Sequence, residues 1–383
     1  MPADLPFMRL ALRLARRGFG RTSPNPMVGA VLVRRGAVIG RGWHRRAGQA
    51  HAEIAALRDA QSRGHPRAGL TGATLYVTLE PCSTQGRTPP CTDAIIAAGI
   101  RRVVAAARDP NPAHDGRGFE ILRRAGLEVS VGLLGEEAAE MNAAFNHWIV
   151  RRTPLVTLKA AMSLDGKIAT AAGESRWITG PKARALGGWL RAGADAILVG
   201  VNTIVQDDPS LTVRRPGFAG KRWRRIVLDP SARIPLAAKV LSDPFAADTT
   251  VVVTNAAPAR RAAALARRVR VLRAPERAGG IDLRWLLREL GRQEVTSLLV
   301  EGGGETHATF LSQGLAGRVM FSYAPLVLGG RAARKAVAGR GAGRMAQAIG
   351  LAGAQWRRAG ADIVLTARLP ESARKDRYVH WHR

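Results

Sequence analysis

The sequence has few cysteines and no long hydrophobic run. Cys82 and Cys91 are the only cysteines in 383 residues, which excludes a small secreted domain held by several disulfides. We expect both thiols to be reduced metal ligands in a cytoplasmic protein. No stretch reaches the roughly 18–20 apolar residues of a membrane span. The N-terminal residues lack the pattern of a secretory signal, and we expect the protein's first helix there.

Lysine and acidic residues are scarce relative to arginine. The chain has 52 arginines and 7 lysines against 29 acidic residues, so its formal net charge is +30. Such a charge is typical of nucleic-acid binding. However, the arginines are spread along the chain without a long basic block. Alanine and glycine are abundant too, as GC-rich codon usage would produce. We therefore favour small phosphorylated substrates over nucleic acid as partners.

Hydrophobic patterning predicts two α/β domains, because strands alternate with helices in both halves of the chain. In the first half the pattern predicts helices at 7–17, 51–63, 92–98, 118–125 and 135–147, and strands at 28–34, 37–42, 73–79, 101–107 and 127–132. After Arg151–Pro154 it restarts, with helices at 181–191, 258–267, 282–291 and 305–313, and strands at 155–160, 195–199, 224–229, 249–254, 296–300 and 317–323. We expect domains at 1–150 and 151–370, followed by a basic tail at 371–383.

One histidine and two cysteines form a candidate zinc site. His51 lies at the start of a predicted helix, Cys82 follows a predicted strand, and Cys91 opens the next helix. Three such ligands suit a catalytic zinc, which keeps its fourth position for water. Zinc lowers the pKa of that water toward neutrality, and Glu53 could carry the proton to a leaving amine. This His-x-Glu…Pro-Cys pattern is typical of zinc nucleobase deaminases.

The spacing of the cysteines narrows the class of deaminase. Eight residues separate Cys82 from Cys91, whereas nucleic-acid deaminases usually have two. A structural zinc site is an alternative, but it would need a fourth ligand that the sequence does not show. A buried histidine with two inert thiols is the other alternative.

Further motifs resemble the bifunctional deaminase/reductase family of riboflavin biosynthesis, over about residues 5–368. The resemblance implies a cytidine-deaminase-like three-layer α/β/α domain followed by a dihydrofolate-reductase-like α/β domain. The motifs that carry it are Asn25-Pro26-x-Val28-Gly29, Gly42-Trp43-His44, His51-Ala52-Glu53, Thr78-Leu79-Glu80-Pro81-Cys82-Ser83, Gly86-Arg87-Thr88-Pro89-Pro90-Cys91, Asp109-Pro110-Asn111-Pro112, Ser163-Leu164-Asp165-Gly166-Lys167 and Asp207-Asp208-Pro209.

The resemblance implies that the first domain deaminates 2,5-diamino-6-ribosylamino-4(3H)-pyrimidinone 5′-phosphate. Amide and carboxylate groups would read the base edge, and an arginine would bind phosphate. The substrate contacts carried over by position are Asn25, His44, Arg87, Asp109 and Asn111.

In the second domain, a strand at 296–300 runs through a glycine turn into a helix, which is a common anion-binding arrangement. The resemblance implies that NADPH binds here and reduces 5-amino-6-(5-phosphoribosylamino)uracil to the ribityl product. The cofactor contacts carried over are Ala161, Trp177, Thr203, Asp207, Gly303, Gly304, Glu305 and Thr306. The substrate contacts are Ser175, Arg191, Leu211, Arg214 and Glu301.

Three positions depart from the family pattern. Thr84 stands where a histidine usually follows Cys-Ser, Ala55 replaces a second histidine after His-Ala-Glu, and Pro230 replaces a hydroxyl residue near the cofactor. Thr84 and Ala55 leave a weakened deaminase half as one alternative. The net charge of +30 leaves a nucleic-acid deaminase as a second, and a zinc-stabilised scaffold protein with an occupied fourth ligand position is the third. The resemblance also implies a possible homo-oligomer. For His380 and His382 we favour a basic tail over a metal site.

Overall fold

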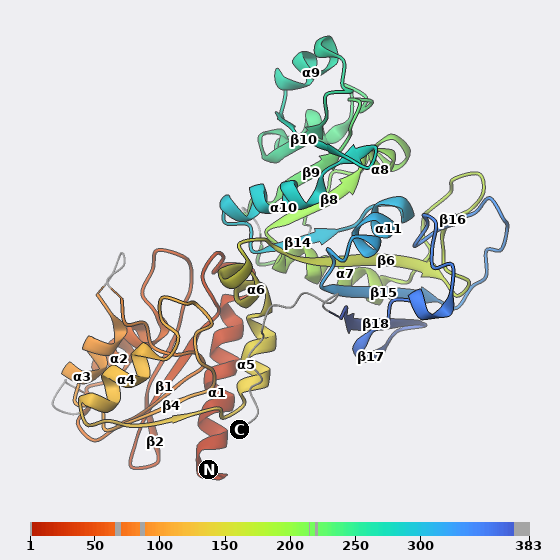
Figure 1. Cartoon of the computed structure of the whole chain (residues 1–383). Helices are drawn as coiled ribbons and strands as arrows, with labels where there is room; N and C mark the ends of the chain where they lie inside the picture. Colours follow the sequence, from red (N-terminus) through yellow and green to blue (C-terminus); the bar gives the residue numbers. More distant parts are fainter. Residues whose placement is uncertain (1, 66–69, 85–88, 214, 219–220, 371–383) are drawn as a thin grey trace. The chain divides into compact units, whose positions relative to one another are not determined.

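The computed structural model describes residues 2–65, 70–84, 89–213, 215–218 and 221–370 (Figure 1). The chain divides into two compact units. The first comprises Met1–Pro154 with Leu290–Thr296, and the second comprises Leu155–Glu289 with Ser297–Arg383. The candidate residues Arg87 and Arg214 and the tail at 371–383, with His380 and His382, lie outside the described residues.

The first unit is built on a five-stranded sheet in the order β2-β1-β3-β4-β5. Its strands are β1 (Gly29–Arg34), β2 (Ala37–Trp43), β3 (Thr74–Val77), β4 (Arg102–Ala105) and β5 (Glu128–Val131). β1 is antiparallel to β2 and β3, while β3, β4 and β5 are parallel. Arg35 and Gly36 both have positive φ, as a tight hairpin turn requires.

Helices cover both faces of this sheet. One face packs against α1 (Leu5–Ala15) and α5 (Gly135–Met141), through a cluster that includes Leu12 and Val31. The other face packs against α2 (Ala52–Ser62), α3 (Cys91–Ala97) and α4 (Arg117–Arg124), through Leu32 and Ile95 among others. α6 (Ala143–Arg151) follows α5. The unit therefore has three layers.

A glycine on β2 sets the position of the first turn of α2. A Cβ atom at Gly42 would lie 2.2 Å from the carbonyl oxygen of Ala52, so a larger residue could not pack there. Because α2 begins directly after His51, this close packing also fixes the place of that histidine.

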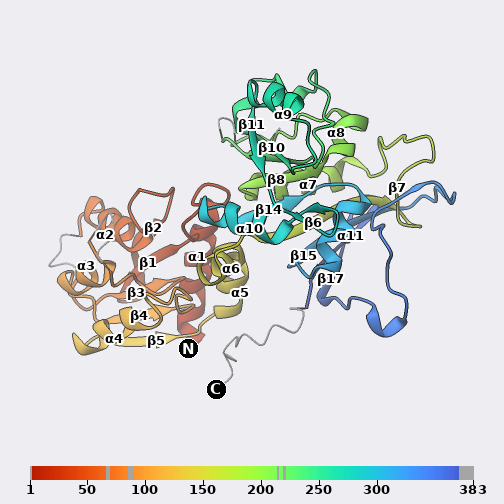
Figure 2. The ribbon, with the colours of Figure 1, turned by 45° about the horizontal axis from the view of Figure 1, so that its top comes forward.

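The second unit is built on a nine-stranded sheet in the order β11-β10-β9-β8-β14-β6-β15-β18-β17 (Figure 2). The strands are β6 (Leu155–Ser163), β8 (Ala196–Gly200), β9 (Arg224–Leu228), β10 (Thr249–Val253), β11 (Arg270–Arg273), β14 (Ser297–Val300), β15 (Arg318–Ala324), β17 (Ala352–Ala359) and β18 (Asp362–Arg368). Along this order, all neighbouring strands from β11 at one edge as far as β15 pair in parallel, whereas β18 is antiparallel to both β15 and β17.

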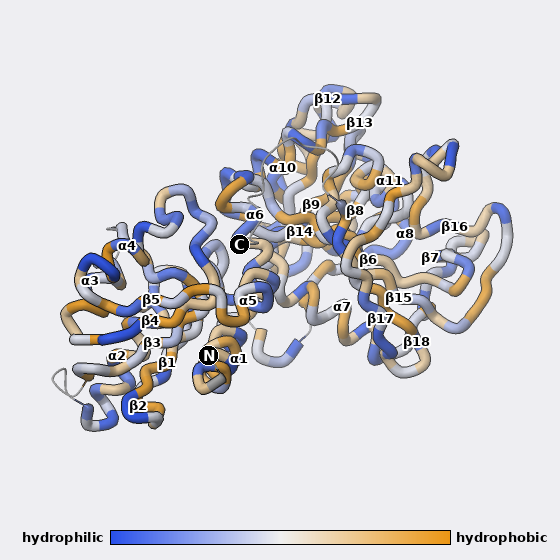
Figure 3. Tube along the Cα trace, turned by 60° about the horizontal axis from the view of Figure 1, so that its bottom comes forward, coloured by the Kyte–Doolittle hydropathy of each residue, from blue (hydrophilic) through white to orange (hydrophobic). Residues whose placement is uncertain are grey.

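Helices of the second unit are α7 (Pro181–Gly193), α8 (Val201–Asp207), α9 (Ala259–Ala266) and α11 (Gly304–Ser312), together with α10 (Leu283–Arg292), whose last three residues belong to the first unit. Two short ribbons pair β7 (Lys167–Ala169) with β16 (Arg334–Lys335) and β12 (Glu276–Arg277) with β13 (Gly280–Ile281). Short 3-10 helices span Pro2–Asp4, Arg16–Gly18, Lys239–Leu241, Ala246–Asp248 and Met345–Gln347. Hydrophobic and hydrophilic residues are mixed along both units (Figure 3). Within the described residues, no helix has the length and apolar composition needed to cross a membrane.

The alternation of strands and helices is confirmed, and so is the helical stretch over 135–147. It consists of two helices, which meet at Asn142. Its side chain pairs with the backbone of Met27, accepting from N at 2.8 Å and donating to O at 2.9 Å. The hydrophobic pattern did not predict α8, β11, β17, β18 or the short strands β7, β12, β13 and β16. Every residue of β17 except Ala359 is exposed, so this strand lacks the alternation that marks a half-buried strand.

Candidate active sites

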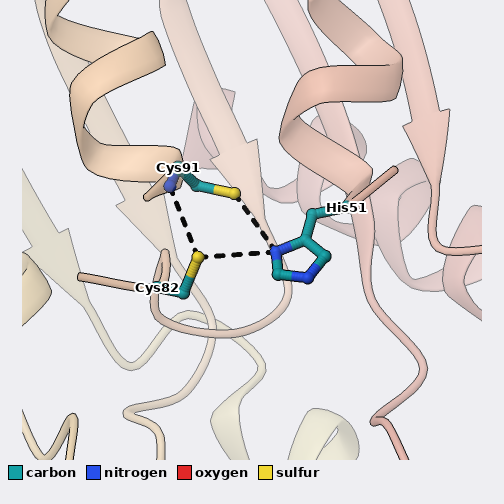
Figure 4. A group of neighbouring side chains, drawn as sticks. All are labelled: His51, Cys82 and Cys91. Carbon is teal, nitrogen blue, oxygen red and sulfur yellow. Dashed lines mark hydrogen bonds between the residues drawn. The ribbon is translucent and has the colours of Figure 1, made fainter. Parts of the chain in front are cut away.

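Three side chains from separate elements meet in the first unit. His51 precedes the first turn of α2, Cys82 follows the loop after β3, and Cys91 is the first residue of α3. The Nδ1 atom of His51 lies 3.4 Å from the sulfur of Cys82 and 3.3 Å from that of Cys91. Figure 4 shows this nitrogen directed toward both sulfurs.

These separations fit a tetrahedral zinc ion. Zinc bonds of about 2.3 Å to sulfur and 2.0–2.1 Å to nitrogen place two such ligands about 3.6 Å apart. A hydrogen bond from the Cys91 thiol, together with His51, lowers the pKa of Cys82 well below its usual range, which favours the thiolate form that binds metal. Among the described residues, this group contains three side chains that can bind a metal. Three protein ligands suit a site that keeps one position for water.

Glu53 lies beside this group on the first turn of α2. Its side chain is buried and is in hydrogen-bond contact with Cys91. Burial disfavours the charged carboxylate and raises the pKa of Glu53 to about 7. A carboxyl group therefore sits where the predicted acid/base is needed.

Asn25 and His44, both predicted substrate contacts, are joined to each other. Asn25 Nδ2 lies 3.1 Å from His44 Nε2, and His44 Nδ1 lies 3.1 Å from the carbonyl oxygen of Ala50. Burial lowers the pKa of His44, which favours the neutral ring. The ring also meets His51 edge-on, with their centroids 5.6 Å apart. The two residues therefore stand at the metal group.

Asp109 and Asn111 lie on a loop that Glu80 holds in place. The buried Glu80 carboxylate accepts backbone N–H groups of Asp109 at 3.1 Å, Gly116 at 3.0 Å and Gly118 at 2.9 Å. Burial raises the pKa of Asp109 to about 6, although its carboxylate accepts the backbone N–H of Asn111. Glu80 lies within one of the sequence motifs, but no role for it was predicted from the sequence.

In the second unit, Arg191 of α7 and Glu301 after β14 form a bidentate ion pair. Arg191 Nε lies 2.7 Å from Glu301 Oε1, and Nη2 lies 2.6 Å from Oε2. Burial opposes the charge on Glu301, but attraction to Arg191 and Lys159 outweighs burial and lowers its pKa to about 2. Both are predicted substrate contacts, and the structure brings them together.

Ser175 and Asp207 are also brought together, although one is a predicted substrate contact and the other a predicted cofactor contact. The Ser175 hydroxyl donates to Asp207 Oδ1 at 2.9 Å. Asp207 ends α8, which also carries the half-buried Thr203. Trp177 is 72% exposed and packs one face against the guanidinium of Arg184, at 4.6 Å from the ring centroid.

Two further predicted contacts, and the position that departs from the family pattern, lie in the same unit. Ala161 lies on β6 opposite Ser322 of β15. Leu211 is buried beyond the end of α8. Pro230, the departure noted in the sequence, accepts hydrogen bonds at its carbonyl oxygen from the backbone N–H and the hydroxyl of Thr254. These bonds hold the loop although position 230 has no hydroxyl side chain.

The predicted glycine turn joins β14 to α11. Gly303 precedes the first turn of α11 and provides no side-chain cap, and a Cβ atom there would meet open space. Gly302, in contrast, packs against Thr306, where a Cβ would lie 2.9 Å from the threonine Cβ. The N–H groups of the first turn of α11, which has no side-chain cap, fit an anionic part of a cofactor such as a phosphate.

Known proteins match both halves of the chain. Residues 1–107 match the cytidine and deoxycytidylate deaminase zinc-binding region, and residues 154–365 match the RibD C-terminal domain. The riboflavin biosynthesis protein RibD of Aquifex aeolicus is 46% identical over 85% of this chain and 88% of its own length. That of Actinobacillus pleuropneumoniae is 40% identical over 94% of each chain. The chain belongs to the RibD family.

Solved RibD structures agree with this assignment. That of Acinetobacter baumannii superposes with a TM-score of 0.83, at 36% identity, over 96% of this chain and 99% of the other. The structure entitled diaminohydroxyphosphoribosylaminopyrimidine deaminase/5-amino-6-(5-phosphoribosylamino)uracil reductase, from Thermotoga maritima, gives a TM-score of 0.81 at 33% identity. It covers 96% of this chain and 99% of the other.

Family membership confirms several predictions from the sequence. Like other RibD proteins, the chain is a bifunctional deaminase and reductase of riboflavin biosynthesis. It combines a cytidine-deaminase-like domain with a dihydrofolate-reductase-like domain, as predicted. Zinc and NADPH are its cofactors.

Proposed function

We propose that the deaminase occupies residues 1–150 and acts on 2,5-diamino-6-ribosylamino-4(3H)-pyrimidinone 5′-phosphate. The reductase then occupies residues 151–370 and converts 5-amino-6-(5-phosphoribosylamino)uracil to its ribityl product. The likeness to the Thermotoga maritima enzyme supports this choice of substrates. The observation that carries the proposal is the meeting of His51, Cys82 and Cys91 beside the buried carboxyl group of Glu53.

In the deaminase half, His51, Cys82 and Cys91 would hold zinc, which would lower the pKa of a water molecule toward neutrality. The Glu53 carboxyl group would accept a proton from the attacking water and donate it to the amino group that leaves as ammonia. Its buried position excludes bulk water from this transfer.

The other residues of the deaminase half bind and orient the substrate. Asn25, oriented by His44, presents its amide to the base edge. Asp109 and Asn111 contact the substrate from the loop that Glu80 anchors. Each of these groups acts by hydrogen bonding, and its orientation is fixed by a neighbour.

In the reductase half, NADPH supplies the hydride, and the chain's own residues position the two reactants. The backbone N–H groups at Gly303 and Gly304 bind a cofactor phosphate, with Glu305 and Thr306 on the same turn. Ala161, Trp177, Thr203 and Asp207 complete the cofactor contacts. Ser175 and Leu211 contact the substrate; Arg214, also carried over as a substrate contact, lies outside the described residues.

Arg191 and Glu301 bind the substrate of the reductase as a unit. A guanidinium has five N–H donors, and Arg191 uses Nε and Nη2 for Glu301 and Nη1 for the carbonyl oxygen of Thr212. The remaining donors bind the substrate phosphate, and Glu301 accepts from ribose hydroxyl groups. The tight pairing keeps both side chains in one orientation before the substrate arrives.

Paired variants test this division of labour. We expect Glu53→Gln to abolish deamination while the protein retains zinc and still oxidises NADPH with the deaminated substrate. We expect Glu301→Gln to abolish NADPH oxidation with the deaminated substrate and to leave deamination intact. Glu137→Gln, an exposed residue paired with Arg16, serves as the control and should leave both activities unchanged. Deamination that survives in Glu53→Gln would overturn the proposal.

The chain also carries features that support a cytoplasmic homo-oligomer. Cys82 and Cys91 are free thiols, as metal ligands in a reducing compartment must be.

The assembly concerns strand β17, which forms an edge of the nine-stranded sheet and carries Trp356, a side chain that is 61% exposed. Light scattering after size exclusion measures the assembly, and a mass near the 40.9 kDa of one chain would contradict it.

A further inference from the structure

A charged side chain lies in the apolar core of the second unit. Arg225 is on β9 and is only 1% exposed. Because alternate residues of a strand share one face of its sheet, Arg225 lies on the same face as Val227, which belongs to the hydrophobic core there. A buried charge is costly unless it is paired and hydrogen-bonded, so the partners of Arg225 indicate what this side chain does.

The guanidinium of Arg225 joins two separate segments of the chain. Its Nη1 and Nη2 atoms form a bidentate ion pair with Asp243, at 2.7 and 2.8 Å, and Nη2 also donates to the carbonyl oxygen of Val240 at 3.2 Å. These two partners lie in one segment, around the 3-10 helix Lys239–Leu241. The remaining bond leaves that segment, because Nη1 also donates to the carbonyl oxygen of Ser210 at 2.8 Å.

Ser210 begins a turn that a second arginine holds at its other end. Arg191, which is paired with Glu301, donates through Nη1 to the carbonyl oxygen of Thr212 at 3.2 Å. The hydroxyl oxygens of Ser210 and Thr212 lie 3.2 Å apart. Between these two residues Leu211 has a φ of 49°, a left-handed conformation that leucine keeps only where its surroundings impose it. Two arginines therefore hold the two ends of a strained turn.

We propose that Arg225 is a positioning residue of the reductase. It fixes the carbonyl oxygen of Ser210, and the turn that follows presents the carbonyl oxygen of Thr212 to Arg191. This contact is a second fixed point for Arg191 beside Glu301, and it directs the remaining donors toward the substrate phosphate. Arg225 is fully buried, so it acts only through this turn. The inference rests on the substrate contact proposed above for Arg191.

Two variants separate positioning from stability. Asp243→Asn leaves the charge of Arg225 buried without its counter-ion but keeps the donor to Ser210. We expect it to unfold at lower denaturant, with the KM for the deaminated substrate unchanged. Arg225→Met/Asp243→Asn removes both charges together with that donor. We expect it to be more stable than Asp243→Asn and yet to raise this KM about tenfold, as the loss of one hydrogen bond to a charged group does, with kcat changed much less.

The measurement is the initial rate of the reductase at saturating NADPH against the concentration of 5-amino-6-(5-phosphoribosylamino)uracil, beside denaturant unfolding of the same proteins. Inhibition by ribose 5-phosphate gives a second measure of the phosphate contact, and we expect it to weaken by the same factor in the double variant. The matched control is Arg222→Met/Asp248→Asn. It removes an ion pair with an exposed arginine just before the same strand, and it should leave KM unchanged.

The order of the KM values decides between positioning and stability. A KM that rises most in Asp243→Asn, the least stable variant, would show that Arg225 acts on stability alone and would overturn the inference. An unchanged KM in the double variant would overturn it as well. Zinc content and the deamination rate should be unchanged in every variant, because both belong to the first unit. Arg191→Met with wild-type KM would instead overturn the substrate contact proposed above.

Discussion

Glu80 provides a sharp test of how the deaminase site is held together. Its carboxylate accepts three backbone N–H groups, two at Oε2 and one at Oε1. In Glu80→Gln one oxygen can still accept from Asp109 and Gly116, but the amide NH2 then faces the N–H of Gly118. One hydrogen bond to a charged group is lost, and two donors oppose each other. Hydrogen bonds to charged groups contribute about 1.5–3 kcal/mol, so we expect the variant to lose about 2–4 kcal/mol of stability.

The assay combines denaturant unfolding with enzyme kinetics. We expect the first unit to unfold at lower denaturant and the KM of deamination to rise, because the loop that carries Asp109 and Asn111 loosens. The reductase rate should stay at the wild-type value. Glu137→Gln breaks only an exposed pair with Arg16 and should cost less than about 1 kcal/mol. Wild-type stability and wild-type KM in Glu80→Gln would refute the reasoning.

Three other predictions concern zinc, a buried ion pair and acid stability. Cys82→Ala, or removal of zinc by a chelator, should abolish deamination and leave NADPH oxidation with the deaminated substrate intact; equal loss of both rates would contradict separate sites. Arg191→Met should destabilise the second unit by about 3–5 kcal/mol, because it leaves the Glu301 carboxylate buried without its guanidinium, and Arg191→Met/Glu301→Gln should recover part of this loss. Unchanged denaturant unfolding of the single variant would count against that pairing. Hydrogen bonds from Arg102 lower the pKa of Asp4 from 3.8 to about 2 in the folded state. The ionised Asp4 carboxylate therefore contributes about 2 kcal/mol to the free energy of unfolding above its unfolded pKa, and this contribution is lost as pH falls through the folded pKa. Asp4→Asn should therefore be less stable than wild type at about pH 6, and this difference should shrink to about 0.4 kcal/mol near pH 2; a difference that does not change with pH would exclude this linkage.

The metal group was predictable because its ligands lie at the ends of regular elements. His51 and Cys91 each begin a helix, and Cys82 follows a buried strand, so the hydrophobic pattern that predicts the elements also places the ligands. The strand-turn-helix unit at 296–313 was predictable for the same reason.

Interactions between distant loops were not predictable from one sequence. The Glu80 carboxylate meets N–H groups 29 to 38 residues away, and Arg191 meets Glu301 across 110 residues. Nothing in the local pattern marks these partners. The break at Asn142 likewise depends on its contact with Met27, 115 residues away, which outweighs the local preference for one continuous helix.

The most direct measurement is a coupled assay on the zinc-loaded protein. It follows the ultraviolet change of deamination and the loss of NADPH at 340 nm, starting from the diaminopyrimidinone ribosyl phosphate with and without NADPH. The account predicts deamination without NADPH, and NADPH oxidation only after the deaminated product has formed. NADPH oxidation that precedes deamination, or the absence of both signals, would contradict it.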